Sequence, residues 1–167
     1  MANTYTLIEA KTLGSSTASI TFSSIPQTYT DLKLVASTRN NNADTDNNGT
    51  ISFNSSTSSR SAIFVYGTGS SALSGTDTGG FTWGEVGNNA TSNTFSNFEI
   101  YIPNYTSSNY KSYSNDGVTE QNATRSVQML VAGLWSNTAA ITSITLTPQS
   151  YSYLASSTFY LYGIKNS

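Results

Sequence analysis

Cysteine and histidine are both absent from the chain. Without cysteine the protein has no disulfide bonds, no thiolate zinc site and no cysteine nucleophile. Without histidine it lacks the commonest general base, the imidazole metal ligand and every triad built on histidine. No recognised nucleophile arrangement remains. We therefore expect a protein that is not an enzyme and has no cofactor.

One enzymatic alternative stays open on the sequence alone. Glycoside hydrolysis needs only a pair of carboxylates, and acidic residues on neighbouring strands can form such a pair. The candidates are Asp77, Glu85, Glu99, Asp116 and Glu120.

Charged residues are scarce, at 10% of the chain against a usual ~25%. Serine, threonine, asparagine, glycine and tyrosine supply most of the polarity. The net charge is −2, and the seven basic residues are scattered singly. Because a nucleic-acid backbone is bound by clustered positive charge, we expect no nucleic-acid partner.

Long hydrophobic runs are missing as well. No window approaches the 18 apolar residues of a membrane-spanning helix. The first residues, MANTYTLIEAKTL, have neither a basic segment nor the apolar run of a secretion signal. We expect no membrane insertion and no signal peptide.

What the sequence does contain is alternation of apolar and polar residues, which is typical of strands. In NFEIYIP, alternation predicts that Phe98, Ile100 and Ile102 face inward and that Glu99 and Tyr101 face outward. SAIFVYG is a short apolar run of β-branched and aromatic residues that suits a buried strand. Similar alternation recurs in TYTLIEA, ASITFSSI, DLKLVAST, TISFN, YKSYSND, SVQMLVAGLW, AITSITLTP and STFYLYGI.

The spacing of these segments predicts roughly nine or ten strands, and no stretch has a helical period. We expect an all-β protein with a single antiparallel β-sandwich or jelly-roll-like domain over residues 1–167. The connecting segments, which include residues 40–49 and 68–80, are polar and predicted to be loops.

The segment ADTDNNGTISFN, residues 43–54, resembles a calcium loop in the placement of Asp44 and Asp46. An EF-hand also needs flanking helices and a glutamate at its last position, where this chain has Ser55. Asn48-Gly49 is a strong turn dipeptide, so a hairpin turn is the favoured interpretation. Calcium binding by Asp44 and Asp46 stays open.

Aromatic residues make up 12% of the chain. Some are expected to be exposed in loops, where flat amphipathic rings stack on sugars or anchor interfaces. Glycines flank Trp83, and NYTSSNYKSY holds three tyrosines. The candidate interface or glycan contacts are therefore Trp83, Tyr105, Tyr110 and Tyr113.

Four segments contain a distinctive combination of short sequences, TYTDL, FEIYIPNY and FYLYGIK. The segments are SITFSSIPQTYTDLKL, NTFSNFEIYIPNYTSSNYKSYS, VAGLWSNTAAITSITLTP and STFYLYGIKNS. Through them the chain resembles small β-sandwich proteins of tailed bacteriophages, especially phages of cyanobacteria and other aquatic bacteria. The resemblance covers most of the chain and includes no catalytic motif. It implies a virion structural protein on the exterior of the particle, made in the cytoplasm of a bacterial host. Such a protein is either a capsid decoration (cement) protein or a part of the tail or fibre.

Two mechanisms follow from this resemblance. In the first, a homo-oligomer, expected to be a trimer, clamps subunits of the major capsid protein. In the second, a tail protein binds a glycan or other host receptor through Trp83, Tyr105 and Tyr110, and several copies supply avidity. The first is favoured, because the sequence shows no extended fibre shaft.

Overall fold

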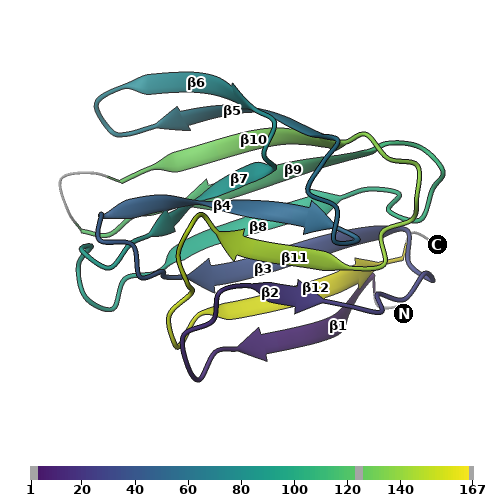
Figure 1. Ribbon diagram of the computed structural model, residues 1–167, viewed down its shortest axis with the longest axis horizontal. Helices are drawn as coiled ribbons and strands as arrows, with labels where there is room; N and C mark the ends of the chain where they lie inside the picture. The colour runs from purple at the N-terminus through teal and green to yellow at the C-terminus, as the bar shows by residue number, and fades with distance from the viewer. Residues whose placement is uncertain (1–3, 123–125, 166–167) are drawn as a thin grey trace.

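The computed structural model describes residues 4–122 and 126–165, with the backbone alone described for residues 81–83. In these residues all regular structure is β-strand, and the strands form two antiparallel sheets that pack against each other (Figure 1). The expected all-β antiparallel sandwich is confirmed.

The large sheet has eight strands. In spatial order they are β1 (Tyr5–Thr12), β12 (Thr158–Ile164), β3 (Asp31–Thr38), β8 (Ser96–Ile102), β9 (Lys111–Val118), β10 (Gln128–Trp135), β5 (Arg60–Gly67) and β6 (Ala72–Asp77).

The small sheet has four strands. In spatial order they are β2 (Ile20–Phe22), β11 (Ile144–Pro148), β4 (Asp46–Phe53) and β7 (Phe81–Val86). Successive strands often lie in different sheets, since β2 and β4 belong to the small sheet while β3 and β5 belong to the large one. The chain therefore crosses between the layers several times, as in double-sheet jelly rolls.

Strand β8 shows how alternation builds the core. Phe98, Ile100 and Ile102 are buried, and Glu99 and Tyr101 between them face solvent, as predicted. The same rule holds in β3 and β12. Both sheets contribute to one main core cluster, which includes Ile20, Phe22, Leu32, Leu34, Ile51, Phe53, Phe98, Ile100, Trp135, Ile144, Leu146, Phe159 and Leu161. Each such side chain stabilises the fold by roughly 1.5–3 kcal/mol relative to an exposed one.

A second, smaller cluster lies under β5 and β10. It contains Ala62, Val127, Met129 and Val131, with Phe64 and Tyr66 packed against it. Figure 1 shows β5 and β6 at the top of the molecule, beyond the edge of the four-stranded sheet. This end of the large sheet is therefore less completely covered than the rest.

Two strands occur that the sequence did not predict, so the described residues contain twelve strands rather than the roughly nine or ten expected from spacing. β6 lies inside the predicted loop 68–80. Its sequence, ALSGTD, has few of the residues that favour strands, and it is held by pairing with β5. Gly75 allows this pairing, because a Cβ there would come within 2.6 Å of the Phe64 ring. β7 is the second unpredicted strand.

The hairpin turn predicted at Asn48-Gly49 is wrong. Both residues lie inside β4, where Gly49 pairs with Pro148 on one side and Trp83 on the other. The chain turns before Asn48-Gly49, in the segment between β3 and β4, where it passes from the large sheet to the small one. There the side-chain oxygen of Asn42 accepts a hydrogen bond from the backbone N–H of Asp44 at 3.2 Å, in the manner of an Asx turn.

Candidate functional site

The outer face of β5 and β10 is aliphatic and open to solvent. Ile63 and Val65 of β5 lie opposite Ala132 and Leu130 of β10, and Leu134 continues the row. These five residues are called the aliphatic face below. The exposed fractions are 63% for Ile63, 50% for Val65 and 50% for Leu130. Such a concentration of large apolar side chains on one face marks an interaction surface.

SAIFVYG forms the predicted strand, but the prediction that this strand is buried holds for only one of its faces. Ala62 is buried in the smaller cluster and Phe64 packs against it, so these two side chains face the core. Ile63 and Val65 alternate with them and point away from it, and no element in the described parts of the chain covers them. Periodicity shows that both faces of β5 are apolar, but it contains no information about what lies over the second face.

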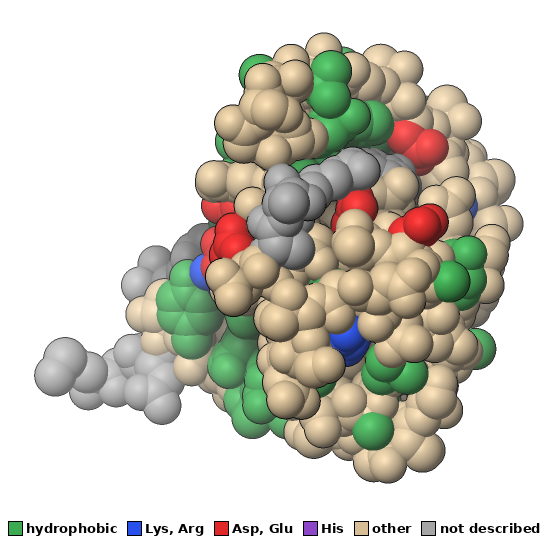
Figure 2. Space-filling view, turned by 90° about the vertical axis from the view of Figure 1, so that its left-hand side faces the viewer, with side chains coloured by type: hydrophobic (Ala, Val, Ile, Leu, Met, Phe, Trp, Pro, Cys, Tyr) green, Lys and Arg blue, Asp and Glu red, His purple; other side chains and the backbone are tan. Residues whose placement is uncertain are grey.

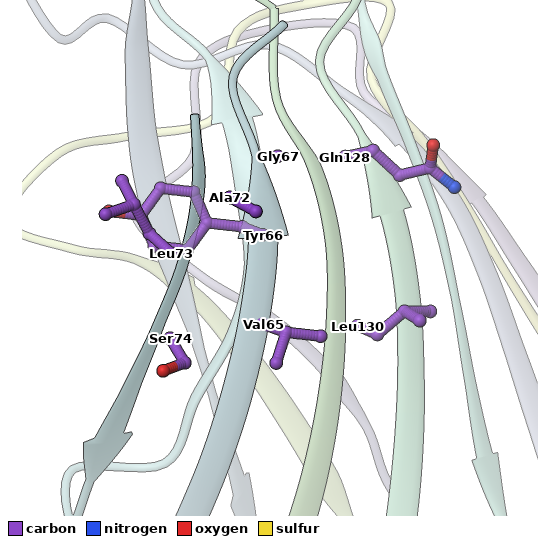
Figure 3. A pocket seen from close by; sticks show the side chains of 8 residues that line it. All are labelled: Val65, Tyr66, Gly67, Ala72, Leu73, Ser74, Gln128 and Leu130. Atoms are coloured by element: carbon purple, nitrogen blue, oxygen red, sulfur yellow. The ribbon is translucent and has the colours of Figure 1, made fainter. Parts of the chain in front are cut away.

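A shallow hollow of about 510 Å³ deepens this surface toward β6. Val65 and Leu130 lie side by side on neighbouring strands, and small residues follow at Gly67, Ala72 and Ser74 (Figure 3). Because these small side chains leave room beside two larger ones, the surface has a depression with apolar lining residues.

The aliphatic face is uncharged along the three strands β5, β6 and β10. Residues that pair across antiparallel strands share one face of the sheet, so Ser74 and Thr76 of β6 accompany Val65 and Ile63. None of the outward positions on these strands carries a charge. The first charged neighbour is Asp116 of β9, opposite Leu130.

The middle of the large sheet, at β3 and β8, is polar on its outer face. Lys33 Nζ lies 2.7 Å from a carboxylate oxygen of Glu99, and the Tyr101 hydroxyl donates a hydrogen bond to Asp31 at 2.7 Å. That hydrogen bond, followed by burial, raises the pKa of Tyr101 to about 12. The outer face of the large sheet is therefore ionic at its middle strands and aliphatic at β5 and β10.

Two of the tyrosines expected to be exposed are buried, so the expectation is wrong for them. Tyr105 is 0% exposed, and its hydroxyl donates a hydrogen bond to the carbonyl of Pro26. Tyr113 is also buried, with its ring 5.7 Å from that of Phe53. Alternation in β9 turns Tyr113 inward, and Tyr105 sits in a turn that folds down onto the core. Burial raises the pKa of both hydroxyls, and that of Tyr113 reaches about 12.

The other two aromatic candidates are Tyr110, whose side chain the structure describes, and Trp83, whose side chain it does not. Tyr110 is 58% exposed and stays a candidate contact residue. The side chain of Trp83 lies outside the described residues, although its backbone belongs to β7. The structure thus does not bring the four predicted residues together into one site.

The carboxylates considered for glycoside hydrolysis are placed in different surroundings. Glu99 and Asp116 are cross-strand neighbours on β8 and β9, but they lie on the open outer face. Glu85 is fully buried, where it accepts a hydrogen bond from Asn40 Nδ2 at 2.6 Å. Burial and the charge of Glu85 raise the pKa of the enclosed Tyr153 hydroxyl. A carboxylate sealed in this way stabilises the link between the sheets rather than meeting a substrate.

No cluster of three or more His, Cys, Asp or Glu side chains that could hold a metal ion occurs in residues 4–122 and 126–165. Over the same residues, no helix is long and apolar enough to cross a membrane. Comparisons of the chain with protein-family models, with curated proteins and with solved structures find no match. The fold is an all-β sandwich, and its large sheet has an open, uncharged, aliphatic outer face at β5 and β10.

Proposed function

We propose that the chain is a non-enzymatic structural protein of a phage particle, a capsid decoration protein that self-associates and clamps subunits of the coat. The observation that carries this proposal is the aliphatic face. Apolar side chains that are half exposed or more, on three neighbouring positions, are stabilised when another protein covers them.

The occupant of the aliphatic face is a second copy of the same chain. When copies of one surface meet around a symmetry axis, the side chains nearest the axis approach their own counterparts. A charged surface repels itself in that arrangement, whereas the outward positions of β5, β6 and β10 bring no like charges together. The expected assembly is a trimer in which this face of each copy meets at the axis.

The low charge of the chain fits this function. Contacts made by apolar and hydrogen-bonding groups are screened little by salt. A particle exposed to changing ionic conditions therefore keeps such contacts. The polar middle of the large sheet, which holds Lys33 and Glu99, and the exposed Tyr110 remain for contact with the coat.

A second candidate function is receptor binding by a tail or fibre protein. It is favoured by a separate hollow with a polar wall and an aromatic wall, on the core side of β5. The two functions predict different places in the particle.

The proposal is tested by measuring the copy number and location of the chain in purified virions, with quantitative mass spectrometry and gold labelling. Hundreds of copies over the head support a decoration protein. A small number of copies at the tail contradicts decoration and supports receptor binding. Absence from the particle overturns both functions.

A further inference from the structure

A second hollow, of about 300 Å³, opens on the core side of β5, opposite to the aliphatic face. It is called the polar hollow below. It lies between the end of β5 and the start of β4, at the end of the molecule seen in Figure 2. There, hydrophobic side chains gather at the height of β5 and β6, and acidic side chains lie below them. Its volume is at the lower end of the ~300–1,000 Å³ typical of small-molecule sites.

One wall of the polar hollow is aromatic and apolar. Phe64 and Tyr66 have ring centroids 6.0 Å apart and planes tilted by 39°. Val127 and Met129 lie beneath them and are buried. The Phe64 ring is closely packed against Gly75, so this wall is positioned by the fold, and the partly buried rings of Phe64 and Tyr66 line the hollow.

The other wall is polar and uses the segment that resembles a calcium loop. Asp44, Asp46 and Asn48 line it, together with Asn42 and Asn47. The wall is held by backbone hydrogen bonds to the loop after β7, among them Asn88 N–H to the Asn42 carbonyl at 2.7 Å. The carboxylate of Asp44 and the amide of Asn48 make no hydrogen bond within the described residues. They are therefore free to bind a ligand.

We infer that the polar hollow binds a neutral saccharide unit. A sugar ring has a face of C–H groups, which packs on aromatic rings, and a rim of hydroxyl groups. Free carboxylate oxygens accept hydrogen bonds from hydroxyls, and a free amide both donates and accepts them. The hollow presents these two kinds of surface on facing walls.

The charges of the side chains that line the polar hollow favour neutral saccharides over acidic ones. Two carboxylates and no basic side chain line the polar hollow. An acidic sugar or a sulfated one would place a negative charge beside Asp44 and Asp46, which is unfavourable. A neutral hexose or deoxyhexose meets no such penalty.

A divalent cation fits the polar hollow less well. Calcium takes six to eight oxygen ligands, and the described residues provide no third carboxylate beside Asp44 and Asp46. A cation would also leave the aromatic wall of Phe64 and Tyr66 unused. The saccharide accounts for both walls.

This inference deepens the receptor-binding candidate and is independent of self-association, which uses the other side of β5. Single-site affinity for one sugar unit is expected to be weak, in the millimolar range. Several copies in a particle would raise the effective affinity by avidity. Failure of saccharide binding would leave the test of the aliphatic face unaffected.

The experiment is a nuclear magnetic resonance titration of the full chain with glucose, galactose, mannose, rhamnose and N-acetylglucosamine, each to tens of millimolar. At least one of these sugars is expected to shift the amide signals of residues 42–48, 64–66 and 127–129. Asp44→Ala and Tyr66→Ala should each weaken that binding about tenfold or more, because each removes one wall's contact. Tyr5→Ala removes an exposed tyrosine on β1, at the far edge of the large sheet, and serves as the matched control.

Three outcomes would overturn the inference. The first is that none of the five sugars shifts these signals. The second is that the shifts cluster around Tyr110 and disappear in Tyr110→Ala. The third is that calcium chloride, added to chelator-treated protein, shifts the signals of Asp44 and Asp46 while no sugar binds, which would assign a cation site instead. Sedimentation of the same samples reports separately on self-association.

Discussion

Val65→Lys is expected to dissociate the oligomer without unfolding the chain. Val65 lies in the middle of the aliphatic face, between Leu130 of β10 and Ser74 of β6. It is a better position than Leu130, because a lysine at 130 would lie opposite Asp116 and gain a partner. At position 65 the added charge has no acidic cross-strand neighbour.

The magnitude follows from exposure. Full burial of a valine, leucine or isoleucine side chain contributes roughly 1.5–3 kcal/mol. Val65 is 50% exposed, so covering it contributes roughly 1 kcal/mol per copy. Val65→Lys loses this contribution in every copy and adds the cost of placing an unpaired ammonium in an apolar contact. We expect a total loss of about 3 kcal/mol or more per contact between two copies, which weakens association at least ~100-fold.

The assay is analytical ultracentrifugation over a range of concentrations, with thermal unfolding in parallel. The matched control is Leu7→Lys, which changes an aliphatic side chain with 51% exposure on β1, at the opposite edge of the same sheet. Because both positions point to solvent in the single chain, each variant should change the stability of the fold by only about 0.5–1 kcal/mol.

The reasoning is refuted if Val65→Lys associates as strongly as the unaltered chain. It is refuted equally if Leu7→Lys dissociates the oligomer as much as Val65→Lys does. A large loss of thermal stability in Val65→Lys would show that this side chain is not on an outer face.

Three further predictions test the placement of side chains in the core. Tyr105→Ala should cost about 3–5 kcal/mol of stability and lower the melting temperature by roughly 6–20 °C, whereas Tyr110→Ala should stay within about 0.5 kcal/mol; equal effects in calorimetry would contradict the burial of Tyr105. Gly133→Ala puts a methyl group into the ring of Tyr113 and should lower stability by about 1–3 kcal/mol, seen as a lower urea midpoint at unchanged slope. Burial raises the pKa of Tyr113 to about 12, so between about pH 10 and 12 the unfolded chain loses this proton while the folded chain keeps it, and stability falls by roughly 2–3 kcal/mol. Denaturation at both ends of this range should show a smaller fall for Tyr113→Phe, and an identical fall would contradict the assignment.

Much of the fold could be predicted because alternation is strong where both sheets meet. Phe98, Ile100 and Ile102 are separated by a charged residue and a tyrosine, so only one face of β8 can be buried. β6 could not be predicted in this way. Its residues are small and polar, and the strand exists because β5 offers it a backbone edge, which is a property of the assembled sheet.

The candidate site could be predicted less well. Tyr105 lies in a polar turn segment, and the sequence does not show that this turn folds down so that the ring reaches Pro26. Ile63 and Val65 were assigned to a strand correctly, but their exposure depends on how far the small sheet extends. A signal for the aliphatic face was present, since β10 also has apolar residues on both faces, at Leu130 and Leu134 as well as Met129.

The most direct test of the central claim is an electron cryomicroscopy structure of the assembled oligomer, in which the exposure of Ile63, Val65 and Leu130 is measured. Copies of the chain are expected to meet at these three side chains, each of which becomes buried. An oligomer that forms through other surfaces and leaves all three in solvent would contradict self-association through the aliphatic face, and so would a chain that stays single at every concentration.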